Sequence, residues 1–176
     1  HGNEEFRKKW LSRPVSNDLM IKNFAIVKDI GIPFSVNNIL GFPHETYELA
    51  FDTIRLNRFI DSDDRNAYHF APFHGTPLRA ECERLGLLKN EDIVQSIVIG
   101  ESILNLPGFP FEQRQALVKT FNMYVKFPES RWPEIKRAEA ETPEGRKIYE
   151  ELKQEFMDRF FNVDTQNFEH AAASVQ

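Results

Sequence analysis

The sequence is poor in several features that would point to particular classes of protein. Its 176 residues include a single cysteine, Cys82, so this chain alone can form neither an internal disulfide nor a cysteine-ligated cluster. A lone thiol favours a reducing compartment, and we expect a cytoplasmic protein. Basic residues are outnumbered, with 22 Lys and Arg against 27 Asp and Glu, which argues against nucleic-acid binding as the main task. No apolar run approaches the ~20 residues of a membrane span, and no signal peptide is recognisable, so we expect no membrane partner.

What is present suits a globular domain. Hydrophobic residues make up 41% of the chain, and the 16 Phe can bury large areas in a core. The chain opens on His1-Gly2 and not on Met, so we expect it to be a piece of a longer polypeptide.

The spacing of apolar residues and the capping residues predict a strand–helix–strand arrangement in the N-terminal half of the chain. The predicted helices cover residues 3–11, 16–31, 46–59 and 76–86, and the predicted strands cover 34–40 and 66–73. Short links between such elements are typical of a parallel α/β sheet. Residues 91–105 fit a helix or a strand. Further helices are predicted at 111–125 and from Trp132 and Thr142 onward. We therefore divide the chain into an α/β part (1–105), a helical extension (106–163) and a disordered tail (164–176).

Two asparagines lie inside the first predicted strand, which is otherwise apolar. Neighbouring residues on a strand point to opposite faces, so only one of Asn37 and Asn38 can face a barrel interior, and the other needs a partner of its own. One alternative is purely structural, in which an amide ties a neighbouring strand or loop. In parallel βα folds the functional groups gather at the carboxyl ends of the strands. That rule nominates residues 37–43 and 70–76, and also His1-Gly2 if the chain begins at the tail of a preceding strand.

These same segments resemble motifs of radical S-adenosylmethionine (SAM) enzymes. Residues 37–46 (NNILGFPHET) resemble the strand–turn–helix motif IxGxPGET, residues 70–78 (FAPFHGTPL) resemble PxPGTPL, and residues 1–5 (HGNEE) resemble the end of the strand ESGxxE. The subgroup with an N-terminal cobalamin-binding domain is the most similar. Two positions depart from the motifs, since His44 and His74 replace a glycine and a proline. We expect His44 to occupy a turn position that favours glycine.

The resemblance implies a fold class, a chemistry and a set of cofactors. The fold would be α/β, the last βα units of a partial parallel βα-barrel, followed by the α-helical extension. The enzyme would cleave SAM reductively with a [4Fe–4S] cluster and do radical chemistry on a small-molecule substrate, with cobalamin as a further cofactor of the subgroup. The CxxxCxxC cluster motif is absent, and Cys82 matches no ligand position. The isolated chain is therefore expected to be inactive, with the missing N-terminal half of the same polypeptide and an electron donor such as flavodoxin or ferredoxin as partners.

By the match, five residues would bind SAM and two would face the substrate. The cofactor-binding set is His1, Asn37, Gly41, Pro72 and Phe73, and the substrate-facing pair is Asn38 and His74. The missing half should also leave an unpaired strand edge, and we expect the isolated chain to be poorly soluble.

Other chemistries are less well supported by the residues. His44, His69 and His74 have neither HxxxH nor HxH spacing, so no metal site is predicted. No GxSxG elbow and no phosphate loop occurs. The alternative to an enzyme is a non-catalytic α/β interaction or scaffold module, in which the asparagines, histidines and turn motifs only maintain the fold.

Overall fold

The computed structural model describes residues 1–94 and 102–161. They form an α/β fold that is mostly helical and has one two-stranded parallel sheet within the described ranges. The chain divides into two compact units, residues 1–121 and residues 122–176. Residues 106–121, which the sequence assigns to the helical extension, thus lie in the first unit. The predicted tail, 164–176, and most of the ambiguous segment 91–105 lie outside the described residues.

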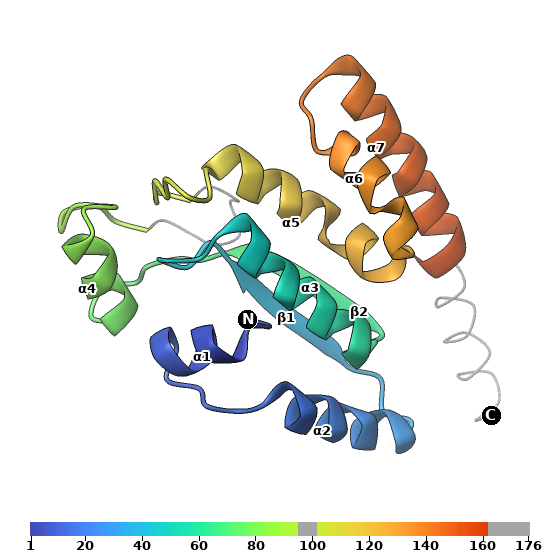
Figure 1. Cartoon of the computed structure of the whole chain (residues 1–176), viewed down its shortest axis with the longest axis horizontal. Helices are drawn as coiled ribbons and strands as arrows, with labels where there is room; N and C mark the ends of the chain where they lie inside the picture. The colour runs from blue at the N-terminus through green and yellow to red at the C-terminus, as the bar shows by residue number, and fades with distance from the viewer. Residues whose placement is uncertain (95–101, 162–176) are drawn as a thin grey trace, which may run out of the picture. The chain divides into compact units, whose positions relative to one another are not determined.

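The first unit contains the sheet and the helices around it. In chain order the elements are α1 (Glu4–Trp10), α2 (Asn17–Asp29), β1 (Ser35–Leu40), α3 (Tyr47–Ile60), β2 (Asp64–His69) and α4 (Pro77–Arg84), followed by α5 (Phe111–Lys126), which runs across the unit boundary. Figure 1 shows β1 and β2 side by side, with α3 connecting them. The strands are parallel, with Asn37 opposite Asn66 and Leu40 opposite His69.

Capping side chains start the helices at the positions that the sequence indicates. Ser16, Thr46 and Thr76 accept hydrogen bonds from the N–H groups of Leu19, Leu49 and Arg79, respectively, at 3.2–3.3 Å. Each of these bonds satisfies a backbone N–H that the first turn of a helix leaves without a partner. The second strand differs from the prediction. It covers Asp64–His69, not 66–73, because residues beyond His69 leave the ladder for a turn rich in Pro and Gly.

The second unit is helical in its described part. It contains the end of α5, a 3₁₀ turn (Glu129–Arg131), α6 (Trp132–Ala138), α7 (Pro143–Phe156) and the π-helical segment Met157–Phe161. Ile135, Ile148 and Leu152 form part of its buried core. No helix within residues 1–94 and 102–161 is long and apolar enough to cross a bilayer.

Candidate functional site

The two faces of the sheet have different surroundings. Asn38 and Leu40 point to the face covered by α3, and they are 6% and 0% exposed. Asn37 and Ile39 point to the opposite face, where Ile39 is 41% exposed and Asn37 is also exposed. On that bare face the Asn37 Oδ1 accepts a hydrogen bond from Asn66 Nδ2 at 3.4 Å. Asn37 is thus the amide that remains open to a ligand.

The Asn38 amide is held by α3. Its Oδ1 accepts from Asn57 Nδ2 at 2.8 Å, and its Nδ2 donates to Asn57 Oδ1 and to Asn66 O, both at 3.2 Å. Asn57 Nδ2 also donates to the backbone carbonyl of Thr53 at 2.8 Å. The structure therefore places the predicted substrate-facing residue Asn38 on the helix-covered face. The alternation along β1 allows only one of the two amides to reach the bare face.

The turn after β1 is organised by a buried carboxylate. Glu45 Oε2 accepts the N–H groups of Gly41 and Phe42 at 2.5 and 3.0 Å, and Glu45 is 3% exposed. Gly41 adopts φ +87°, and a Cβ there would lie 2.7 Å from the Cδ of Arg114. The close backbone approach that Gly41 allows is therefore occupied by an α5 side chain.

His44 confirms the expectation of a glycine-like turn position. Its φ is +68°, in the left-handed region that side chains other than glycine rarely adopt. The ring stacks on Trp10 with centroids 3.8 Å apart, and Nε2 lies 2.6 Å from Glu81 Oε1. These contacts from α1 and α4 hold His44 in a conformation that it would otherwise avoid.

His1 is enclosed by the protein. Its side chain is 0% exposed, its ring stacks on Phe6 at 4.1 Å, and Nδ1 accepts the Asn3 N–H at 3.1 Å. Nε2 lies 3.1 Å from Glu45 Oε1, without the alignment of a hydrogen bond.

The turn after β2 lies beside the turn after β1. The Phe70 N–H donates to Leu40 O at 2.8 Å, and the rings of Phe70 and Phe42 are 4.8 Å apart. Further along, Pro72 is buried and its carbonyl accepts from Arg79, whereas Phe73 is 52% exposed.

His74 is exposed and lies 3.1 Å from the carbonyl of Asn90 through its Nε2. It therefore contacts the segment after α4 and not the bare face of β1.

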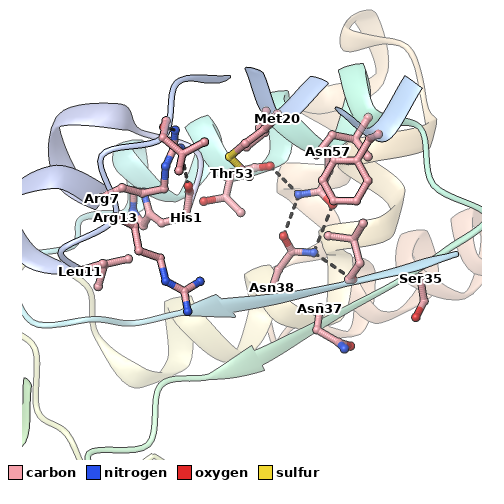
Figure 2. Close-up of a pocket in the computed structure, with 15 residues that line it drawn as sticks. His1, Arg7, Leu11, Arg13, Met20, Ser35, Asn37, Asn38, Thr53 and Asn57 are labelled. Atoms are coloured by element: carbon pink, nitrogen blue, oxygen red, sulfur yellow. Dashed lines mark hydrogen bonds between the residues drawn. The ribbon is translucent and has the colours of Figure 1, made fainter. Parts of the chain in front are cut away.

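One cavity in this unit, of about 400 Å³, brings together three of the predicted residues. His1, Asn37 and Asn38 line it, together with residues of α1, α2 and α3 (Figure 2). Gly41, Pro72, Phe73 and His74 do not line this cavity. The predicted site is thus divided between the cavity beside β1 and the two turns at the carboxyl ends of the strands.

Two buried arginines near the site were missed by the sequence analysis. Arg7, 3% exposed, donates to the carbonyls of His1 and Val15 at 2.7 and 2.6 Å. Arg114, 0% exposed, donates to the carbonyls of Phe109 and Leu104 at 2.5 and 2.7 Å. Burial lowers the pKa of both guanidinium groups. No sequence pattern distinguishes these arginines from solvated ones, since their partners are backbone carbonyls.

His69, at the end of β2, is also buried. Desolvation, and then the positive charge of Arg114, lower the pKa of its imidazole. The neutral ring is therefore favoured at neutral pH.

The described residues do not fit a metal cluster. Within residues 1–94 and 102–161, no three His, Cys, Asp or Glu side chains are placed to share a metal ion. Cys82 is buried in α4, and burial raises the pKa of its thiol to about 11, which disfavours the thiolate that a metal needs. Comparisons of the chain with protein families, with curated proteins and with solved structures found no match.

Proposed function

We propose that this chain is the distal part of a radical SAM enzyme. In this proposal β1 and β2 belong to the last βα units of a partial parallel barrel, and the helices after residue 105 extend it. The proposal is supported by the parallel pairing of β1 and β2, and by the two neighbouring turns after their carboxyl ends. The sheet also has one face covered by α3 and one bare face, as the wall of a barrel would have.

The observation that carries the proposal is the position of Asn37. Its amide is exposed on the bare face of β1, three residues before the end of the strand. An amide offers both a donor and an acceptor, which suits the amino, carboxylate and hydroxyl groups of SAM. Tyr68 lies on the same face, opposite Ile39, and is 38% exposed, so an aromatic ring is available to an adenine base.

The other assigned residues lie in the two turns. Gly41, Pro72 and Phe73 would contact the cofactor through backbone and apolar surface, and His74 would face a small-molecule substrate. The Arg114 side chain would have to move before the Gly41 backbone could contact SAM. His1 would contribute only where its enclosed side chain became accessible.

A [4Fe–4S] cluster, with ligands from outside this chain, would supply one electron to cleave SAM. A flavodoxin or ferredoxin would reduce it, and cobalamin would be held by a further domain. In the described part of the chain no three His, Cys, Asp or Glu side chains are placed to share a metal ion, so its own contribution would be to bind SAM and the substrate.

The test uses the longer polypeptide that contains this chain, purified without oxygen. We expect iron and sulfide in the protein, and we expect 5′-deoxyadenosine and methionine after addition of dithionite and SAM, measured by mass spectrometry. Asn37→Ala should lower the rate of 5′-deoxyadenosine formation and raise the KM for SAM. Ser35→Ala is the matched control, since Ser35 lies at the opposite end of β1 and should leave both values unchanged. A protein that holds no iron and does not cleave SAM would refute the proposal.

A scaffold or interaction module is the second candidate. It is favoured by the complete burial of the His1 side chain and by the use of Asn38 within the fold. If the chain is such a module, Asn37→Ala should leave SAM binding and SAM cleavage by the longer polypeptide unchanged.

A further inference from the structure

Two cavities of the first unit differ in charge. The cavity of about 400 Å³ beside β1 has Arg7 and Arg13 in its lining, and no Asp or Glu among the described residues that line it. A second cavity, of about 680 Å³, has four carboxylates and one guanidinium in its lining: Glu4, Glu5, Asp18, Asp52 and Arg55. The chain as a whole carries a net charge of -5, so a cavity with arginines and no carboxylate stands out from the rest of the protein. The cavity beside β1 is therefore the one that suits an anion.

Arg13 brings a cation without a partner into this cavity. Figure 2 shows its side chain reaching into the cavity from the segment after α1. The side chain is exposed, and no acceptor within residues 1–94 and 102–161 pairs with its guanidinium group. The Arg13 N–H donates to Arg7 O at 3.1 Å, which fixes the backbone beside α1. Because a guanidinium group has donors and no acceptor, its natural ligand is an anion.

Arg7 offers a second donor at the same end of the cavity. It is 3% exposed, and its two terminal nitrogens donate to the carbonyls of His1 and Val15 at 2.7 and 2.6 Å. Its Nε is buried and has no acceptor in the described part of the chain. A buried donor without an acceptor costs free energy, and an anion beside Arg7 and Arg13 would supply the acceptor.

Apolar side chains line the cavity beyond the arginines. They come from α2, β1 and α3, and they include Met20, Phe24, Val36, Leu56 and Ile60. α2 has 13 residues and buries none of them, so the apolar side chains that it turns to the cavity remain partly in contact with water. A hydrocarbon chain in the cavity would remove that apolar surface from water. The volume also lies within the range of small-molecule pockets, roughly 300–1,000 Å³.

We propose that the cavity beside β1 binds an aliphatic carboxylate, with its head group at Arg7 and Arg13 and its hydrocarbon chain against α2 and α3. A carboxylate has acceptors only, and it thus matches two groups that are donors only. The inference goes beyond the proposed function. It uses only residues of this chain and needs neither SAM nor a cluster.

NMR titration of the isotope-labelled full chain with sodium octanoate tests the inference. We expect saturable shifts of the Asn37 backbone amide and of the Asn57 side-chain amide, which line the cavity, and no shift of Ile148 in the second unit. Octylamine has the same chain with a positive head, and acetate has the same head without the chain. Both should bind at least about tenfold more weakly than octanoate, because each lacks one of the two recognised features. Added salt should weaken octanoate binding, since Arg13 is exposed to solvent.

Two variants of equal charge separate the cavity from the general surface. Arg13→Ala should raise the Kd for octanoate by about fivefold or more, because it removes the partnerless cation. Lys22→Ala is the matched control. It removes one positive charge from an exposed position of α2 outside the lining, and it should leave the Kd unchanged. Arg13→Lys keeps the charge and should recover part of the affinity.

Three outcomes would overturn the inference. The first is the absence of saturable shifts at the lining residues, and the second is octylamine binding as tightly as octanoate, which would mark an apolar cavity without preference for an anion. The third is an unchanged Kd in Arg13→Ala. The titration uses neither SAM nor iron, so its failure leaves the proposed function intact. Octanoate binding by a chain whose longer polypeptide does not cleave SAM would refute only the proposed function.

Discussion

The Asn38–Asn57 pair allows a quantitative test of why Asn38 is used inside the fold. Asn57 is 2% exposed, and the two amides exchange hydrogen bonds of 2.8 and 3.2 Å. Asn57→Leu leaves the buried Asn38 Oδ1 without a donor, and Asn38→Val leaves Asn57 Oδ1 in the same condition. An unpaired buried polar group costs about 1–3 kcal/mol, so each single variant should lose that much unfolding free energy.

The double variant should behave differently from the sum of the singles. Replacing both partners by apolar groups of similar size leaves no unpaired amide, and the loss should be within about 1 kcal/mol of zero. Because the two single losses together amount to about 2–6 kcal/mol and the double loss is near zero, the coupling free energy should be about 2–6 kcal/mol.

Urea unfolding measures these changes, with Trp10 fluorescence as the reporter of the unit that contains the pair. Trp132 lies in the second unit, so Trp132→Phe is introduced in every variant. Far-UV circular dichroism checks that each unfolds in one transition. Additive losses in the double variant, or single variants as stable as the parent, would refute the assigned role of the pair.

Three further predictions concern other contacts of the first unit. Gly2→Ala should cost about 1–3 kcal/mol in urea unfolding, because its Cβ would overlap the Asp52 carbonyl, and an unchanged midpoint would contradict that close approach. Hydrogen bonds from Arg84, and then from His44, lower the pKa of Glu81 from 4.5 to about 2. The stability from this pair should be present above pH 4.5 and lost as the pH falls toward 2. A carboxyl NMR titration should show the pKa rising in Arg84→Ala, and no rise would exclude this pairing. Cys82 should react with iodoacetamide at pH 8 only after unfolding, and rapid labelling of the folded chain would contradict its burial.

The local elements of the fold could be predicted well from the sequence. A cap such as Thr46 and the apolar spacing of the following helix depend on residues a few positions apart, so the sequence alone contains the information. The glycine-like conformation of His44 was expected from the resemblance, because the motif IxGxPGET has a glycine at that position. The end of β2 was less predictable, since apolar residues such as Phe70 suit a strand and a packed turn equally.

The candidate site was only partly predictable. The alternation along β1 required Asn37 and Asn38 to face opposite sides, but it did not say which one α3 would cover. Arg7 and Arg114 have no sequence signature, because each donates hydrogen bonds to backbone carbonyls that only folding brings near the side chain.

The sequence by itself thus determined the succession of helices and strands, their caps and the turn that ends β1, since these depend on neighbouring residues. Only the tertiary structure decided that His1 is enclosed, that Asn38 pairs with Asn57 and that a cavity lies beside β1. These features arise from contacts between residues far apart in the chain, and such contacts are set by how whole elements pack and not by local preference.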